Sequence, residues 1–246
     1  ARGDQCDACG QSYEQSELDK PHCAICESTP RIVPTKHWFF RLDRYEERLE
    51  EWLKGCEGWR DNVRNFARGI VREGLPARSI TRDLEWGVPV PLEEAKDKVL
   101  YVWFDAPIGY ISFTKEHFKG TDNPEEWREW WSDKDVELVH FLGKDNIIFH
   151  AVIWPAMLMG QGEFNLPTSI PANEYLNFMG QKFSKSRGVG VTAEEILESF
   201  DADRVRYYLT TVAPEGRDTS FTWEDFIQRN NDELSDVVGN FAHRML

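Results

Sequence analysis

The sequence has no long hydrophobic run, little positive charge and few cysteines. None of its apolar stretches reaches the roughly 18 residues that a membrane-spanning helix needs, and the chain starts at Ala1 with neither an initiator Met nor an apolar signal segment. Only 29 basic residues stand against 43 acidic ones, which excludes a uniformly basic nucleic-acid-binding surface. We therefore expect a soluble cytoplasmic protein without membrane contact, cut at its N-terminus.

Four of the five cysteines form two pairs, and the fifth, Cys56, belongs to neither pair. Cys6 and Cys9 form the first pair, Cys23 and Cys26 form the second, and thirteen residues separate the pairs. Two such turns can place four thiolates tetrahedrally around zinc, whereas a disulfide framework suits a secreted chain. The pattern predicts a zinc site, and Cys56 is predicted to be a small, half-buried hydrophobic residue.

Alternating strand and helix signals predict an α/β fold. Of the 246 residues, 41% are hydrophobic, which is enough for one large domain or two small ones. Amphipathic helices are expected over residues 43–54, with Asp43 as the N-cap and Glu46 three residues after it, and over residues 59–73. The apolar run 99–104 is typical of a strand buried in a parallel sheet, and Pro107 follows at the start of a helix.

A second strand and helix follow this first unit. Strand 136–142 leads into helix 146–159, which Pro155 should kink, and Asp145 is the predicted N-cap. Ligands of open α/β sheets bind at the carboxyl ends of strands, so a polar corner is expected at the start of this helix. His150 lies four residues after Asn146 on the same face of this helix, and it fits either a satisfied core histidine or a ligand-binding histidine.

The loop 180–188 has the composition of a polyphosphate-binding segment. It combines lysines, serines and an arginine with glycines that let the backbone approach a ligand. It lacks the spacing of a Walker phosphate-binding loop, Gly-x4-Gly-Lys-Ser/Thr, so the lysines of this lysine loop would act as mobile point charges. The alternative interpretation is a solvated basic turn without a ligand. A strand is predicted before it, over residues 173–179, and a capping box after it, at Thr192 and Glu195.

Three further helices are predicted downstream of this loop. They begin at Thr192, at Asp203 as an N-cap, and at Thr222, where Asp225 supports the cap. The last helix carries an apolar stripe with nothing beyond it to cover that stripe, which predicts truncation.

These motifs, in this order, resemble the methionyl-tRNA synthetase family of class I, archaeal type. The resemblance rests on Tyr-Val-Trp-Phe-Asp-Ala-Pro-Ile-Gly-Tyr at 101–110, His-Phe-Leu-Gly-Lys-Asp at 140–145 with Phe149 and His150, Trp-Pro-Ala-Met at 154–157, the lysine loop with Phe183 where the family usually has Met, and the motifs at 200–204 and 206–208. It implies ATP-dependent activation of L-methionine to methionyl-adenylate and transfer to tRNA(Met), with Mg²⁺ accompanying ATP and Zn²⁺ bound by the cysteines.

The resemblance also assigns roles to individual residues. It implies a methionine pocket made by Trp103, Ala106, Pro107, Tyr110, Asp145 and His150. The ATP-binding residues that it implies are Lys182, Ser184, Lys185 and Ser186, of which both lysines serve catalysis, and the zinc ligands are Cys6, Cys9, Cys23 and Cys26.

In that family the fold is a Rossmann-type catalytic domain with an insertion. The expected divisions are a zinc-knuckle part of the insertion at 1–35, its helical part at 36–78, the C-terminal half of the catalytic domain at 79–191, and a helical stem-contact region with the first helix of the anticodon-binding domain at 192–246. The family's His-Ile-Gly-His signature is absent from the sequence. We therefore expect a piece that lacks the N-terminal catalytic half and is inactive alone.

Two other functions fit parts of the sequence. A non-catalytic zinc-knuckle module that binds nucleic acid would explain the cysteines but not the strand-end motifs or the lysine loop. A sister class I synthetase for leucine, isoleucine or valine usually carries a large editing domain where this chain has only a short cysteine module and two helices.

Overall fold

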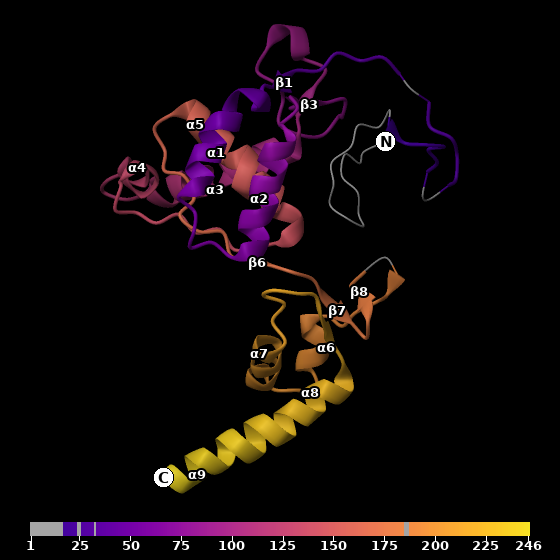
Figure 1. Ribbon diagram of the computed structural model, residues 1–246, viewed down its shortest axis with the longest axis vertical. Coiled ribbons are helices and arrows are strands. Elements are labelled where there is room, and N and C mark those ends of the chain that lie inside the picture. The colour runs from indigo at the N-terminus through magenta and orange to yellow at the C-terminus, as the bar shows by residue number, and fades with distance from the viewer. Residues whose placement is uncertain (1–16, 24–25, 32, 185–186) are drawn as a thin grey trace. The chain divides into compact units, whose positions relative to one another are not determined.

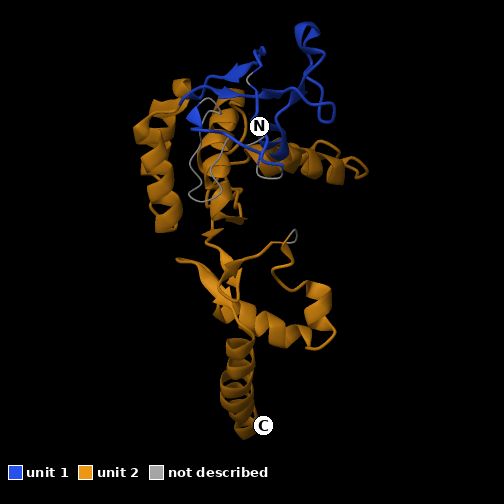
Figure 2. Cartoon of the chain, turned by 90° about the vertical axis from the view of Figure 1, so that its right-hand side faces the viewer, with its two compact units in different colours: residues 1–42, 76–106 blue, residues 43–75, 107–246 orange. Residues whose placement is uncertain are grey.

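The computed structural model describes residues 17–23, 26–31, 33–184 and 187–246. The chain divides into two compact units, coloured separately in Figure 2: Ala1–Leu42 with Pro76–Ala106, and Asp43–Leu75 with Pro107–Leu246. Both helices and strands are present, so the chain is a mixed α/β protein. No helix in the described ranges combines the length and the hydrophobicity needed to cross a membrane.

The first unit contains two short antiparallel ladders. Strand β1 (Phe39–Phe40) pairs with β2 (Arg78–Ser79), and β3 (Thr81–Arg82) pairs with β4 (Val99–Leu100). A 3-10 turn, Glu93–Ala95, precedes β4.

A buried lysine stabilises these ladders. Lys98 is almost fully buried and forms an ion pair with Asp83, which also accepts a hydrogen bond of 2.7 Å from Thr35 Oγ1. Removing a lysine from water is tolerated only when a carboxylate compensates its charge. This pair therefore fixes residue 35 beside the end of β3.

The predicted strand over residues 99–104 is wrong beyond Leu100. β4 ends there and is antiparallel, and helix α3 (Val102–Phe118) begins almost at once. The Tyr101 carbonyl already accepts hydrogen bonds from the Phe104 and Asp105 amides, so the helical turn includes the end of the apolar run. A short apolar run does not by itself distinguish a buried strand from a helix, and Pro107 lies inside α3.

Helices α1 (Glu46–Lys54) and α2 (Asp61–Glu73) pack together in the second unit. The residues they bury are Leu49, Leu53, Val63, Ala67 and Val71. The prediction that Asp43 caps α1 is wrong. A 3-10 turn, Leu42–Tyr45, precedes the helix, and Tyr45 is its N-cap. Gly74, at φ 96°, ends α2 in a conformation that favours glycine.

The predicted strand–helix–strand alternation is present in the second unit, but its first strand is much shorter than the predicted 136–142. β5 (Leu142–Gly143) and β6 (Ala172–Asn173) are parallel, and the connection between them is helical. It runs through a 3-10 turn (Lys144–Asn146), a π-helical segment (Phe149–Ile153) and α5 (Trp154–Gln161). Pro155 lies in the first turn of α5, where a missing amide is tolerated, and the helix changes type just before it. Gly143, not Asp145, is the N-cap of the 3-10 turn.

An aromatic cluster covers this helical connection. Its buried members are Phe118, Trp127, Trp131, Trp154 and Leu158. They come from α3, from a 3-10 turn (Glu126–Arg128), from α4 (Glu129–Ser132) and from α5.

A three-stranded sheet supports the lysine loop. Its central strand β7 (Leu176–Phe178) pairs antiparallel with β8 (Gln181–Lys182) and parallel with β9 (Thr219–Phe221). Helices α6 (Ala193–Leu197) and α7 (Ala202–Thr211) lie between β8 and β9 in the chain. Asp201, not the predicted Asp203, is the N-cap of α7.

The last helix begins where the sequence placed it. Thr222 caps α8 (Trp223–Arg229), which continues without a break through a π-helical segment (Asn230–Gly239) into α9 (Asn240–Met245) (Figure 1). Phe226 of α8 packs into a core with Ile196, Val205, Tyr208, Val212 and Phe221.

Candidate active site

A buried ring and an exposed ring form a hydrogen-bonded pair at the start of the helical connection after β5. The Tyr110 hydroxyl is 2.9 Å from His150 Nε2, and His150 Nδ1 is 3.0 Å from the backbone carbonyl of Asn146. A carbonyl only accepts, so Nδ1 carries the proton. Burial lowers the pKa of His150 although the Asn146 carbonyl opposes that shift. The ring is therefore neutral, and its Nε2 accepts the Tyr110 hydroxyl hydrogen.

A second histidine, which the sequence did not single out, belongs to the same cluster. The His140 ring lies 5.2 Å from the His150 ring and 5.3 Å from the Tyr110 ring, measured between centroids. Its exposed fraction is 8%, and its Nε2 has no hydrogen-bond partner among the described residues. Burial, with a smaller contribution from His150, lowers the pKa of His140 to about 4. His140 is the first residue of the His-Phe-Leu-Gly-Lys-Asp motif at 140–145, and this motif is the sequence feature that could have identified it.

The other predicted pocket residues are divided between the units. Trp103 and Ala106 lie in the first turns of α3 and belong to the first unit, whereas Pro107 and Tyr110 follow on the same helix and belong to the second. The Trp103 and Tyr110 side chains are 39% and 38% exposed, so both rings can reach a ligand. Asp145 is exposed.

An ion-pair network surrounds the turn after β5. Lys144 Nζ lies 2.8 Å from Glu174 Oε2 and 2.7 Å from Asp218 Oδ1. Partial burial opposes the lysine charge, but the hydrogen bonds to both carboxylates raise the pKa of Lys144. The hydrogen bond from Lys144, with that from the Tyr175 amide, lowers the pKa of Asp218, so both groups are charged.

The network extends to the start of α2. Asn62 Nδ2 donates to Glu174 Oε1 at 2.9 Å, and Arg60 pairs with Glu215 at 3.2 Å. Arg60 also donates to the Asn173 side chain at 2.9 Å. These contacts join residues more than 100 positions apart, and no local sequence signal indicated them.

Most of the lysine loop lies within the described residues, while Lys185 and Ser186 lie outside them. Ser184 and Val189 form an antiparallel bridge with two backbone hydrogen bonds of 2.9 and 3.0 Å. Phe183, which replaces the usual Met of the resembled family, contacts the Phe178 ring at 5.5 Å. A Cβ on Gly190 would lie 2.5 Å from the Phe183 ring, so only glycine allows this packing.

Lys182 is the last residue of β8, and its side chain is exposed. Its Nζ lies 4.8 Å from the centroid of the Tyr175 ring. At the other end of the loop, the predicted capping box is present: Thr192 Oγ1 accepts from the Glu195 amide, and Glu195 Oε2 accepts from the Thr192 amide. The loop is thus mounted between a strand and a capped helix, as the sequence predicted.

The described pair of cysteines adopts a tight turn. The Cys23 amide donates to the Ser28 carbonyl at 2.9 Å, and the Glu27 amide donates to the Cys23 carbonyl at 2.8 Å. Glu27 has a φ of 59°, in the left-handed region that a non-glycine residue seldom adopts. Hydrogen bonds from Ser28 and then from Cys23 lower the pKa of the Cys26 thiol, which favours the thiolate that binds metal.

Cys6 and Cys9 lie outside the described residues. Within the described part of the chain, no three metal-ligating side chains come together. Cys56 is buried, and burial raises the pKa of its thiol to about 11, which agrees with a hydrophobic role.

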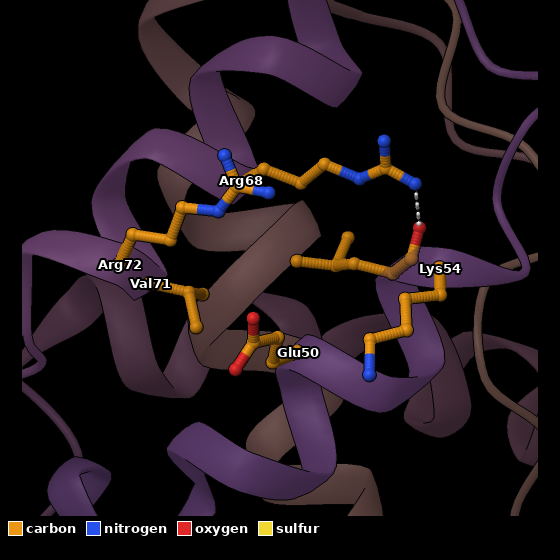
Figure 3. Close-up of a pocket in the computed structure, with 6 residues that line it drawn as sticks. Glu50, Lys54, Arg68, Val71 and Arg72 are labelled. Atoms are coloured by element: carbon orange, nitrogen blue, oxygen red, sulfur yellow. Dashed lines mark hydrogen bonds between the residues drawn. The ribbon is translucent and has the colours of Figure 1, made fainter.

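A small cleft between α1 and α2 is separate from these residues. Glu50 and Lys54 of α1 face Arg68 and Arg72 of α2 across it, and Arg68 Nη2 donates to the Leu53 carbonyl at 2.9 Å (Figure 3). None of the predicted site residues lines this cleft. It therefore plays no part in the candidate site.

Comparison with known proteins gives a consistent result. The family model described as tRNA synthetases class I (M) matches residues 1–246. The methionine–tRNA ligase of Thermoplasma volcanium is 50% identical over 246 residues, which are 100% of this chain and 45% of that protein. The methionine–tRNA ligase of Pyrococcus furiosus is 47% identical over 258 residues, covering 100% of this chain and 36% of that protein.

A solved structure shares the fold. The methionyl-tRNA synthetase of Mycobacterium tuberculosis, bound by methionyl-adenylate, is 31% identical and superposes with a TM-score of 0.76. The match covers 96% of this chain and 46% of that one. The chain thus spans less than half the length of each of these relatives.

Proposed function

Because the chain belongs to the tRNA synthetases of class I (M), we propose that the protein acts in methionine–tRNA ligation. It activates L-methionine with ATP to methionyl-adenylate and transfers the methionyl group to tRNA(Met). Under this proposal residues 79–191 contribute the C-terminal half of a Rossmann-type catalytic domain. Residues 1–35 and 36–78 form the zinc-knuckle and helical parts of its insertion, and residues 192–246 form the stem-contact region and first anticodon-domain helix.

One observation carries the proposal: a continuous series of contacts links the ring pair to the lysine loop. His150 is held by the Asn146 carbonyl, and Asn146 ends the 3-10 turn that contains Lys144. Lys144 in turn contacts the Tyr175 ring, which Lys182 also contacts. These contacts link the ring pair to two lysine ammonium groups within the second unit. They support assigning the rings to the methionine side chain and the lysines to phosphate, because joining an amino acid to ATP requires both groups side by side.

The pocket residues would perform recognition. Aromatic rings suit the polarizable thioether of methionine, and Trp103 and Tyr110 would supply them, with Ala106 and Pro107 beside them on α3. His150 would position the Tyr110 hydroxyl through the hydrogen bond between them. Asp145 would help to order the pocket and the adenylate.

The loop would serve the phosphates. Lys182 and Lys185 would stabilise the negative charge that develops as pyrophosphate leaves, while Ser184 and Ser186 would donate hydrogen bonds to the phosphates. Mg²⁺ would accompany ATP as part of the substrate. These residues act by position and charge alone, and the loop forms no covalent intermediate.

Methionine-dependent exchange of pyrophosphate into ATP, measured on the full-length protein, tests this function. We expect exchange with methionine and not with leucine, isoleucine or valine. Lys182→Gln and Lys185→Gln should each lower the rate about a hundredfold and leave methionine affinity almost unchanged, since the lysines act on the transition state. Lys134→Gln, at another exposed lysine, is the control. Exchange that depends on leucine would identify a sister synthetase, and no exchange with any amino acid would refute the proposal.

A further inference from the structure

The Tyr175 ring contacts two lysine ammonium groups. Lys144 Nζ lies 4.3 Å and Lys182 Nζ lies 4.8 Å from the ring centroid, both within the range of a cation–π interaction. Tyr175 itself is half-buried and lies between β6 and β7. One of its lysines belongs to the strand-end network, and the other belongs to the loop.

The backbone around this ring is held in place independently of the lysine loop. The Tyr175 amide donates to Asp218 Oδ1 at 2.9 Å, and its carbonyl accepts from the Thr219 amide at 3.0 Å. The preceding amide, of Glu174, donates to the Pro214 carbonyl at 2.7 Å. Three hydrogen bonds to the segment 214–219 thus hold the backbone that carries the ring, which we call the Tyr175 platform.

The charges around the platform favour a further cation. Lys144 is paired with both Glu174 and Asp218, so these three residues carry one excess negative charge. No carboxylate within the described part of the chain lies at ion-pair distance from Lys182. The ring face and the excess charge together therefore attract the Lys182 ammonium, and Lys144 adds only a partly compensated repulsion.

We propose that Tyr175 is a positioning residue that seats the Lys182 ammonium beside the turn 144–146 before ATP binds. A free lysine side chain samples many rotamers, and ordering it costs free energy that must otherwise be supplied when the nucleotide arrives. The seat supplies that order in advance, and the ammonium keeps its contact with the ring while it reaches a phosphate, so the contact also stabilises the transition state. This inference rests on the proposed function, because it assigns Lys182 to ATP.

A spectroscopic experiment tests the seat without any activity. Reductive methylation with carbon-13 keeps the lysine charge and labels every ammonium, and Lys182→Arg identifies the Lys182 signal. Because the ring current of Tyr175 shields a group above its face, this signal should lie upfield of that of exposed Lys134. Tyr175→Phe should keep the shift and Tyr175→Leu should abolish it. A Lys182 signal that coincides with that of Lys134 in the unsubstituted protein would overturn the proposal.

A kinetic experiment on the full-length protein tests the consequence for catalysis. Tyr175→Leu should lower kcat for methionine-dependent exchange about two- to fivefold, the factor that corresponds to an exposed cation–π contact. KM for methionine should not change, and Tyr175→Phe should restore the rate. In a Lys182→Gln background, Tyr175→Leu should cause no further loss, because the ring acts only through that lysine.

The outcomes separate the two proposals. An additive loss in the Lys182→Gln background, or unchanged kcat in Tyr175→Leu, would overturn the positioning role. A higher affinity for ATP in Tyr175→Leu would also overturn it, because the ring would then compete with the nucleotide for the lysine. If the unsubstituted protein shows no exchange, the proposed function fails, and the spectroscopic experiment still decides whether the seat exists.

Discussion

At the scale of single residues, the two histidines next to Tyr110 differ in how their polar atoms are satisfied. His150 uses both ring nitrogens, one on the Asn146 carbonyl and one on the Tyr110 hydroxyl. His140 is as deeply buried, but its Nε2 has no hydrogen-bond partner among the described residues. A protonated imidazole there would lose its hydration without gaining a partner, so the folded protein holds His140 neutral.

This burial predicts a loss of stability in acid. The pKa of His140 falls from 6.5 to about 4 on folding. As the pH falls below 6.5, the unfolded chain binds a proton that the folded chain refuses, so the stability present above pH 6.5 is progressively lost until about pH 4. Between pH 7 and pH 4.5 the loss due to His140 should be about 2.5 kcal/mol.

Urea unfolding of the unsubstituted protein and of His140→Phe at these two pH values measures this loss. The unsubstituted protein should lose about 2.5 kcal/mol more than the variant on acidification, since shared carboxylates cancel in the difference. His22→Phe, at an exposed histidine, should behave like the unsubstituted protein. Equal losses in the unsubstituted protein and His140→Phe would contradict the prediction.

At the scale of elements, two predicted caps with the same spacing had different outcomes. Thr192 and Glu195 form the expected capping box, whereas Asp43 and Glu46 do not. The Glu46 carboxylate instead accepts a hydrogen bond of 2.5 Å from the amide of Leu75, 29 residues away. A local pattern predicts a cap only when no tertiary partner competes for its side chains.

The capping box predicts a measurable contribution to α6, which begins directly after the lysine loop. Thr192→Ala should lower the free energy of unfolding by about 1 kcal/mol, because the Glu195 amide loses its acceptor. Thr192→Ser should retain most of that free energy. Hydrogen exchange of the Glu195 amide gives the local readout: it should accelerate in Thr192→Ala and not in Thr192→Ser. Equal exchange in the two variants would mean that the cap does not stabilise the loop's end.

The same scale explains how much of the fold followed from the sequence. Amphipathic periodicity located α1 and α2, because each buries one regular face. It failed at residues 99–104, where every side chain is apolar and the periodicity carries no information. The residue that ends β4, Leu100, is set instead by its pairing with Thr81 of β3, 19 residues earlier in the chain.

At the scale of the whole molecule, the excess of acidic residues is used locally. The net charge is −14, yet some of the acidic residues form specific ion pairs. Glu174 and Asp218 pair with Lys144, and Glu215 pairs with Arg60. Motifs in the sequence predicted the loop and, through family resemblance, Tyr110 and His150. The Tyr175 platform was not predictable, because its contacts join residues 144, 182 and 218, which no periodic pattern relates.

Zinc binding is the last prediction and concerns the N-terminal part of the chain. The turn at Cys23 and Cys26 has the left-handed residue and the lowered thiol pKa that suit a metal-binding knuckle. With Cys6 and Cys9 as the other two ligands, we expect about one tightly bound zinc ion per chain. Since binding to such a site supplies folding free energy, removing the metal should unfold the cysteine-bearing segment.

Metal analysis of the freshly purified protein measures the zinc, and thiol titration with circular dichroism follows its removal. Cys26→Ser should abolish stoichiometric zinc, whereas Cys56→Ala should keep it, because the Cys56 thiol is buried with a pKa of about 11 and stays protonated. Chelation should expose four additional reactive thiols and lower the content of ordered structure. Less than about half an equivalent of zinc, with four free thiols and an unchanged spectrum, would show that the cysteine pairs fold without metal, contrary to the free energy that structural zinc sites contribute.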